Sequence, residues 1–333
     1  MRKTSITKTG LPLVRLHLIM PFLAELERRQ IDATPALLSQ NLTRESANSQ
    51  DIFVPAHVMH NTVEALTEIA NDPYLGISVG AQLDISNWSP FMEASAQAKN
   101  TAELLLMCAI NATKDASSTA LNLETAGNRT RFHVRRVHET KIIPAQVDSF
   151  WIGILVALLE RAAGAGWQPD EVLATVCEPA TIPANYHGIR VARGGGDGPS
   201  ISFPSEWLFL PVTPKTTKAN SPIAGTPAKS LISSVKQTLA PHIDETDLNV
   251  DRAAEICSLG RRALQRQLQN SGTTVKQIIV ELRRERATAE LTGSERPIAE
   301  IAGMVGFVDA TVFSRAFKNW TGLSPRQYRK QHR

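Results

Sequence analysis

One pattern that occurs twice near the C-terminus constrains the fold of this chain most. Residues 250–256 (VDRAAEI) have helical apolar spacing and end in a four-residue turn, after which RRALQRQLQ begins at Arg261. Residues 298–305 (IAEIAGMV), a turn over residues 306–309 and ATVFSRAFKNW over residues 310–320 repeat the pattern. Apolar residues at intervals of three and four positions predict helices. The sequence therefore predicts two units of the form helix, tight turn, helix.

The second helix of each unit has an apolar side and a polar side. In the first unit Leu264 and Leu268 face inward, and in the second Phe313, Phe317 and Trp320 do. In a helix-turn-helix, the outward side of the second helix enters the major groove of DNA. Gln269 also faces outward in the first unit. The predicted DNA contacts are the outward residues Arg261, Arg262, Gln265 and Arg266 in the first unit and Thr311, Ser314, Arg315 and Lys318 in the second.

A longer helix predicted over Val275 to Leu291 lies between the two units and suits a rigid connector. The basic charge of the chain is concentrated in the same region. Residues 221–333 carry 17 Lys and Arg against 11 Asp and Glu, a net charge of +6, whereas residues 1–220 carry 19 against 21, a net charge of −2. Such clustering suits a polyanion, because bound phosphates release their counterions. A solvated basic face would explain the charge alone equally well.

Residues 210–228 (LPVTPKTTKANSPIAGTPA) have the composition of a linker. Four prolines stand among Thr, Lys and Ser with little apolar periodicity, at the point where the charge balance changes sign. We therefore predict one domain over residues 1–210, a linker over residues 211–228 and a second domain over residues 229–333.

Residues 1–210 mix helical and strand patterns, which indicates an α+β domain. Helices are predicted over Val58 to Ala70, over Thr101 to Ala116 with Asn100 or Thr101 as N-cap, and over the almost wholly apolar Gln146 to Ala163. Strands of one sheet are predicted over residues 120–124, 130–137, 172–177 and 201–203, the first two joined by a hairpin at Gly127-Asn128. The predicted fold class is an α+β N-terminal domain followed by an all-α C-terminal domain with two helix-turn-helix units.

Basic side chains in this domain offer two candidate sites. His57 and His60 are three positions apart near a helix start, but no third metal ligand is placed near them, so surface or capping histidines are the better interpretation. Arg131, His133 and Arg135 alternate with apolar residues and therefore share one face of a strand. They could hold an anionic effector, although a solvent-facing sheet surface is favoured.

Glycines and aromatic residues offer two more. Residues 193–198 (RGGGDG) resemble a phosphate-binding loop but lack the Lys and Ser or Thr that should follow, so we predict a flexible hairpin tip. Four aromatic residues are candidates for an apolar ligand pocket, although buried aromatics mostly fill cores. They are Trp88, Phe91, Trp151 and Trp167.

No catalytic arrangement is found in the sequence. There is no Ser/His/Asp set and no paired carboxylates, so we predict no enzyme, no cofactor and no metal site. Cys108, Cys177 and Cys257 are widely spaced without a CxxC pair, which indicates buried thiols in a reducing cytoplasm. The apolar stretch from Leu11 to Leu26 is interrupted by charged and polar residues, so neither a leader peptide nor a membrane span is predicted.

Residues 240–330 resemble the DNA-binding domain of the AraC/XylS family. The resemblance lies in LGRRALQR from Leu259, IAEIA from Ile298, GF at Gly306, FSRAFK from Phe313, WTGLSP from Trp320 and YR at Tyr328. Gly260 departs from the family, which usually has Ser there, and Gly303 stands where a larger residue is frequent. The resemblance implies base contacts by Arg262, Gln265, Arg266, Thr311 and Arg315 and structural roles for Gly306 and Phe307. Lys318 at the end of its helix, and Arg326 and Arg329 beyond Pro325, lie where the chain leaves the groove, so we predict that they contact phosphates.

The N-terminal domain is similar to the effector region of the arabinose-binding type in the same family. The similarity rests on Asp72-Pro73 with Gly76 and Gly80, on Gly166-Trp167 with Pro169, and on Phe203, Trp207-Leu208 and Pro211-Val212. It implies a cytoplasmic homodimer that binds double-stranded DNA, responds to a small-molecule effector of unknown identity and activates transcription by recruiting RNA polymerase. The alternatives are an enzyme with a DNA-binding tail, for which the thiolate zinc cluster of methyl-accepting repair proteins is missing, and a constitutive architectural DNA binder.

Overall fold

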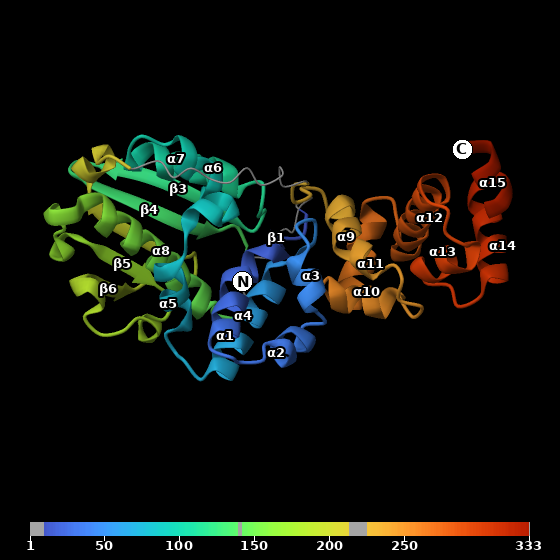
Figure 1. Ribbon diagram of the computed structural model, residues 1–333, viewed down its shortest axis with the longest axis horizontal. Coiled ribbons are helices and arrows are strands. Elements are labelled where there is room, and N and C mark those ends of the chain that lie inside the picture. Colours follow the sequence, from blue (N-terminus) through green and yellow to red (C-terminus); the bar gives the residue numbers. More distant parts are fainter. Residues whose placement is uncertain (1–9, 139–141, 213–224, 333) are drawn as a thin grey trace. The chain divides into compact units, whose positions relative to one another are not determined.

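The computed structural model describes residues 10–138, 142–212 and 225–332, which form two compact units. Residues from Pro12 to Pro227 make the N-terminal unit. The C-terminal unit starts at Ala228 and also includes Gly10 and Leu11. Most of the linker expected over residues 211–228 lies outside the described residues. The predicted order of an α+β region followed by a helical region is confirmed (Figure 1).

A five-stranded sheet with the strand order β3-β4-β7-β5-β6 forms part of the N-terminal unit. All neighbouring pairs are antiparallel except β5 and β6. The four predicted strands are confirmed as members of this one sheet, and Gly127, with a φ of 60°, makes the predicted hairpin turn. The strands are β3 (Thr119–Ala126), β4 (Arg129–Arg136), β5 (Leu173–Val176), β6 (Arg190–Arg193) and β7 (Ser200–Pro204).

Helices surround this sheet, and a two-stranded ribbon of β1 (Leu13–Arg15) and β2 (Phe53–Pro55) lies among them. The predicted helix from Val58 is confirmed as part of α4 (Ala56–Ala70). The predicted cap of α7 (Thr101–Ala112) is confirmed, because the Asn100 side chain accepts the Glu103 N–H. The other helices are α1 (Met20–Arg28), α2 (Thr34–Ser39), α3 (Arg44–Asn48), α5 (Leu75–Gln82), α6 (Ser89–Gln97) and α8 (Ala145–Ala163), with short 3-10 turns that include η1 (Leu16–Ile19) and η2 (Ile85–Asn87).

The predicted buried helix is α8, which packs tightly against α5. A Cβ on Gly76 would lie 2.2 Å from the Gln146 carbonyl oxygen, and one on Gly80 would lie 2.1 Å from that of Phe150. Only glycine permits this approach. Among the described residues, one helix, counted from Ala145 to Gly166, is long and apolar enough to cross a membrane. More than half of it is buried inside the unit, as in the core helix of a soluble protein.

Three sequence predictions for this unit are wrong in part. The helix from Thr101 ends at Ala112 and not at Ala116, because residue 116 bridges to Val14. Residues 193–198 are not a hairpin tip, because β5 lies between β6 and β7 and the loop crosses its end. Of the three alternating basic residues on β4, Arg131 and Arg135 are exposed but His133 is buried, with its Nε2 3.6 Å from the Asp197 carboxylate.

The described residues of the C-terminal unit form helices joined by turns and contain no strand, and the five helices predicted in it are confirmed to within two residues at each end. Gly10 donates its N–H to the Lys229 carbonyl at 2.9 Å, and Leu11 donates to Ser234 Oγ at 2.8 Å, which ties these two residues to the first helix. The helices are α9 (Leu231–Leu239), α10 (Val250–Ile256), α11 (Arg261–Asn270), α12 (Val275–Gly293), α13 (Ile298–Met304), α14 (Ala310–Thr321) and α15 (Pro325–His332).

His60 is not the surface or capping histidine that the sequence favoured. Its side chain is buried on the inner side of α4, because the helix turns Met59, His60 and Val63 toward the core. Burial, reinforced by the positive charge of Arg136, lowers the pKa of His60 to about 3. His60 is therefore neutral near pH 7. In the unfolded chain its pKa is 6.5, so folding becomes less favourable as the pH falls from 6.5 toward 3.

Replacing His60 by Gln is expected to make the N-terminal unit less sensitive to acid. At pH 5 the neutral imidazole costs the wild type about 2 kcal/mol of unfolding free energy, at roughly 1.36 kcal/mol per pH unit below 6.5. Thermal unfolding is measured at about pH 7.5 and pH 5. The loss of stability between these two pH values should be smaller for His60→Gln than for the wild type. His187→Gln, at a half-exposed site beside Glu160, serves as the control. Equal losses in His60→Gln and the wild type would contradict this origin of the acid sensitivity.

Candidate nucleic-acid interface

The first helix-turn-helix unit consists of α10 and α11. The Asn249 side chain caps α10 by accepting the N–H groups of Asp251 and Arg252 at 2.8 and 3.1 Å. Leu264 and Leu268 are fully buried beneath α11. The polar side of α11 is therefore turned outward, with Arg261, Arg262, Arg266 and Gln269 exposed and Gln265 half-buried.

The second unit consists of α13 and α14. Gly306 makes the turn with a φ of 75°, and the Asp309 side chain caps α14 by accepting the N–H groups of Thr311 and Val312. Five aromatic rings pack beneath this unit, with neighbouring centroids 5.3 to 6.3 Å apart. The predicted packing of Phe307 under the turn is confirmed, since its ring contacts those of Phe313 and Trp320. The rings belong to Phe307, Phe313, Phe317, Trp320 and Tyr328.

Arg283 on the connector helix α12 joins the two helix-turn-helix units of the C-terminal unit. Its Nη2 donates to the Glu245 carbonyl at 2.8 Å and its Nε to the Ile243 carbonyl at 3.2 Å, just before α10. The same guanidinium lies 5.5 Å from the centroid of the Phe307 ring. A Cβ on Gly306 would lie 2.3 Å from Arg283 Nη2, so the turn of the second unit fits the guanidinium only with glycine there. Burial lowers the pKa of Arg283.

Apart from Gln265 and Thr311, the predicted contact residues fall into two groups. Three of them bind other parts of the chain: Arg261 Nη1 pairs with Asp251 at 2.8 Å, Ser314 Oγ donates to the Ala310 carbonyl at 2.7 Å, and the half-buried Arg329 donates to the Arg296 carbonyl at 2.6 Å. Five others are exposed and, within the described part of the chain, make no hydrogen bond or ion pair. These are Arg262, Arg266, Arg315, Lys318 and Arg326.

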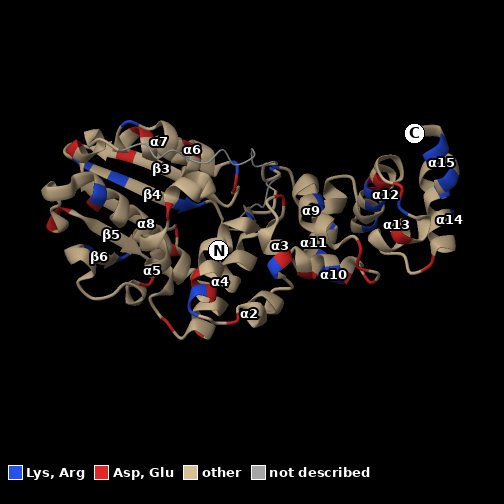
Figure 2. Ribbon diagram, viewed as in Figure 1, with Lys and Arg blue, Asp and Glu red and all other residues tan. Residues whose placement is uncertain are grey.

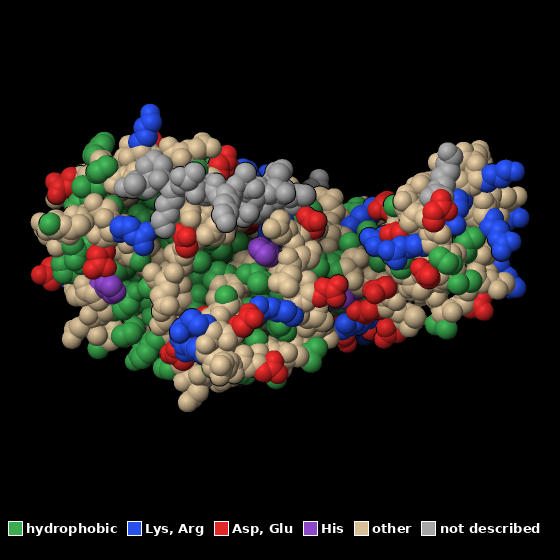
Figure 3. Space-filling model, viewed as in Figure 1, with side chains coloured by type: hydrophobic (Ala, Val, Ile, Leu, Met, Phe, Trp, Pro, Cys, Tyr) green, Lys and Arg blue, Asp and Glu red, His purple; other side chains and the backbone are tan. Residues whose placement is uncertain are grey.

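Basic side chains gather at the C-terminal end of this unit. Lys and Arg follow one another along α15, where the last turn contains Arg329 and Lys330 (Figure 2). The same helix presents them at the surface in the space-filling view (Figure 3).

The sequence analysis missed two exposed apolar residues beside the outward face of α14, Val308 at 92% and Val312 at 53% exposure. The signal that could have found Val312 in the sequence is an apolar residue among the polar residues on the outward face of the helix.

The turn of the first unit differs from its sequence interpretation. Gly260 occupies the N-cap position of α11, as predicted, but its φ of −62° suits any residue and it provides no side-chain acceptor. The left-handed residue of this turn is Ser258, with a φ of 45°. Nothing lies within 4 Å of a Cβ placed on Gly260, so the backbone does not require glycine there.

The comparison with protein-family models agrees with this geometry. A family model described as a helix-turn-helix domain matches residues 253–331, which run from α10 into α15 and so contain both units and the connector. The C-terminal unit is an AraC-type helix-turn-helix domain.

Several curated regulators are similar to this chain over a length close to that of the AraC-type domain. The ornithine utilization regulator of Pseudomonas aeruginosa is 38% identical over 82 residues, which are 25% of this chain and 24% of that protein. The Msm operon regulatory protein of Streptococcus mutans is 33% identical over 104 residues, 31% of this chain and 37% of that protein. The chain thus spans about a quarter to about a third of the length of these relatives.

Solved structures match this chain over two different extents. The C-terminal domain of AraT, a response regulator from Geobacillus stearothermophilus, is 33% identical and matches 30% of this chain and 84% of that chain with a TM-score of 0.29. The transcriptional regulator CdpR from Pseudomonas aeruginosa matches 92% of this chain and 98% of that chain, with 17% identity and a TM-score of 0.34.

Replacing Gly260 by Ser is expected to stabilise the AraC-type domain by about 0.5–1 kcal/mol. The hydroxyl gains an N-cap hydrogen bond, and the unfolded chain loses the freedom of glycine. Thermal unfolding should show a rise of about 2–6 °C for this unit. Gly260→Ala is the matched control, because it restricts the unfolded chain without providing a cap. Equal stability of the Ser and Ala variants would show that no cap forms.

Replacing Arg283 by Met is expected to destabilise the AraC-type domain by about 2–3 kcal/mol. The change leaves two carbonyls without their charged donor and removes the cation from the Phe307 ring. Denaturant unfolding measures the effect. Arg284→Met is the matched control, since Arg284 is the exposed neighbour on the same helix and its replacement should cost less than about 0.5 kcal/mol. Similar losses in both variants would contradict the bridging role of Arg283.

Proposed function

We propose that this chain is a sequence-specific transcription regulator and not an enzyme. In this proposal the AraC-type domain binds double-stranded DNA in the cytoplasm. The observation that carries it is the pair of second helices, α11 and α14, each with buried apolar residues on one side and unpaired Arg or Lys on the other. The net charge of +6 over residues 221–333 supports the same conclusion, because a polyanion is the natural partner of such a surface.

We assign base reading to Arg266 and Arg315. Each lies on the face opposite the buried residues of its helix, and each guanidinium is exposed without an intramolecular partner among the described residues. An Arg fork pairs with O6 and N7 of guanine. Val312 lies one turn before Arg315 and Ala316, and its exposed methyl groups suit contact with the 5-methyl group of thymine. Arg262, Gln265 and Thr311 extend the two reading faces.

Phosphate contacts are assigned to Lys318 and Arg326. Both are exposed, and they lie toward the end of α14 and at the start of α15, where the chain leaves the reading face. Arg261, Ser314 and Arg329 take smaller roles in this proposal, because their donors already bind other parts of the chain. Arg329 in particular holds α15 to the segment that precedes α13.

The N-terminal unit is proposed to bind a small-molecule effector and to dimerise. The apolar stretch from Trp151 to Leu159, which the sequence alone would suggest as a dimer contact, is largely buried in the core and is not the contact that we propose. The α7 residues Leu106 and Ile110, which are 49% and 67% exposed and one helical turn apart, form a better contact surface. Activation of transcription is supported by the names of two relatives, the transcriptional activators NphR and RhaR, and recruitment of RNA polymerase is the further step that we propose for it.

A binding-site selection with the full-length protein tests the division between base readers and phosphate binders. Arg266→Ala and Arg315→Ala should each relax the preference at one or two positions, since one good bidentate pair provides about 1–3 kcal/mol of discrimination. Lys318→Ala and Arg326→Ala should weaken binding to all DNA sequences alike. They should also reduce the slope of log affinity against log salt concentration by roughly one unit per contact. The selected site should span about 20 base pairs for each chain, and a dimer should select two such sites.

Arg284→Ala is the matched control for charge, because it removes an exposed Arg from the same unit outside the two reading helices. It should leave the selected sequence unchanged. If the Arg266 and Arg315 variants keep the wild-type preference and lose affinity uniformly, these residues contact phosphates and the assignment of base readers is wrong.

A further inference from the structure

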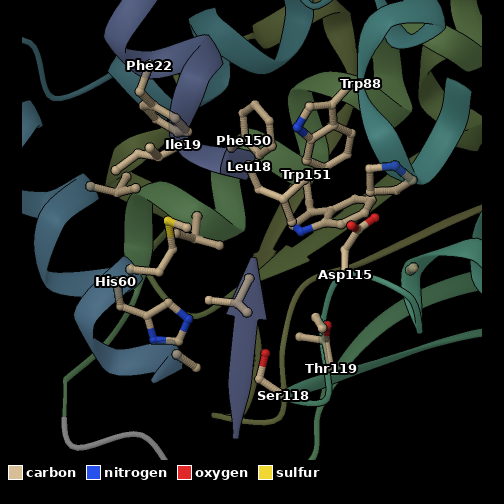
Figure 4. Close-up of a pocket in the computed structure, with 18 residues that line it drawn as sticks. Leu18, Ile19, Phe22, His60, Trp88, Asp115, Ser118, Thr119, Phe150 and Trp151 are labelled. Atoms are coloured by element: carbon tan, nitrogen blue, oxygen red, sulfur yellow. The ribbon is translucent and has the colours of Figure 1, made fainter. Parts of the chain in front are cut away.

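A cavity of about 80 Å³ lies inside the N-terminal unit. It is enclosed by η1, α4, α8, the start of α6 and residues 112–119 between α7 and β3 (Figure 4). Most of its lining is apolar, and aromatic rings form one wall. The Trp88 ring centroid lies 5.4 Å from both the Phe150 and the Trp151 centroids. Met59, Val63 and Leu18 contribute aliphatic surface.

Two buried polar groups on this lining have no hydrogen-bond partner within the part of the chain that the structure describes. They are Trp88 Nε1 and His60 Nδ1, in side chains that are only 6% and 7% exposed. Figure 4 shows the two residues on opposite sides of the cavity. Almost all buried polar groups in proteins are hydrogen-bonded, so such exceptions point to a missing partner. The indole N–H is a donor only, and its partner must therefore be an acceptor.

The cavity offers no free charge to a ligand. Among the described residues, Asp115 is the only Asp, Glu, Lys or Arg on the lining, and its two carboxylate oxygens already accept from Arg15 Nε and Ser89 Oγ, each at 2.6 Å. His60 is neutral near pH 7 because burial lowers its pKa to about 3. A charged ligand would lose its hydration here without gaining a counter-ion. Besides Trp88 and His60, the lining offers the hydroxyl groups of Ser118 and Thr119, which are too few partners for the many hydroxyl groups of a polyol.

We propose that this cavity binds a small uncharged ring compound whose carbonyl or hydroxyl oxygen accepts the Trp88 N–H. The inference rests on the proposed function, in which this compound is the effector. The aromatic wall provides ring contacts, and His60 provides a second polar contact on the opposite side. A cavity of roughly 150 Å³ admits benzene, so a ring requires some of the lining to move. Met59 and the half-buried Leu18 are the flexible side chains that can do so.

Calorimetric titration of the full-length protein with three probes tests the ligand class. Acetophenone is an uncharged ring ketone, ethylbenzene has the same shape without the oxygen, and benzoate carries a negative charge. We expect saturable binding of one acetophenone per chain, with ethylbenzene about fivefold weaker and benzoate more than tenfold weaker. Fivefold is the factor that one typical neutral hydrogen bond provides. These comparisons need no variant.

Trp88→Phe keeps an aromatic ring but removes the N–H. This substitution should weaken the binding of acetophenone about fivefold and leave the affinity for ethylbenzene unchanged. Trp167→Phe is the matched control, since Trp167 packs against Trp207 at a centroid distance of 5.4 Å and does not line the cavity, and it should change neither affinity. The proposal is wrong if acetophenone shows no saturable binding, if benzoate binds as well, or if Trp88→Phe weakens both neutral probes equally.

DNA affinity measured with and without acetophenone separates this inference from the proposed function. Probe binding that leaves DNA affinity unchanged supports the site and contradicts effector control. The base-reader test is carried out without any probe, so its failure would overturn the assignment of base readers and leave the cavity proposal standing.

Discussion

The AraC-type domain depends on one half-buried guanidinium. Arg283 binds two backbone carbonyls before the first unit and lies against the glycine turn and the Phe307 ring of the second. Helices α10 and α13 have seven residues each, too few to be stable alone. Packing and caps must therefore hold them, and Arg283 contributes to both units at once. The 19 residues of α12 make it about 28 Å long, close to the roughly 34 Å of one DNA turn, which suits two readers in successive major grooves.

Much of this unit could be predicted from sequence because its determinants are local. The spacing of Leu264 and Leu268, and of Phe313 and Phe317, fixes which side of each helix is buried, and the remaining residues must face outward. The sequence could not indicate which outward hydrogen-bond donors already bind other parts of the chain. Arg329 reaches a carbonyl 33 positions away, and Arg261 pairs with an Asp ten positions away, so their availability depends on how the helices pack. Val312 was missed because the DNA contacts were predicted from charged and polar residues, and an exposed apolar residue does not meet that criterion.

The N-terminal unit was less predictable because its determinants are distant in sequence. Strands with clear alternation and a hairpin glycine were found, but the parallel pairing of β5 with β6 places a crossing loop where a hairpin was expected. The burial of His60 follows from how α4 packs against α8, which no local pattern reveals. The four aromatic residues considered for a pocket separate into two groups. Trp88 and Trp151 line the cavity, Phe91 packs behind them, and Trp167 joins Trp207 elsewhere.

Effector control requires a physical connection between the cavity and the segment that leads to the DNA-binding unit. The N-terminal unit contains a short one. Asp115 lines the cavity and forms a fully buried ion pair with Arg15. Arg15 in turn donates through Nη2 to the Gly225 carbonyl at 2.8 Å, two residues before this unit ends at Pro227. Replacing one partner of a buried ion pair is costly, so Asp115 and Arg15 must move together. In the proposed effector control, a ligand that displaces Asp115 would act through the Arg15 side chain on the backbone of Gly225, near the end of the N-terminal unit.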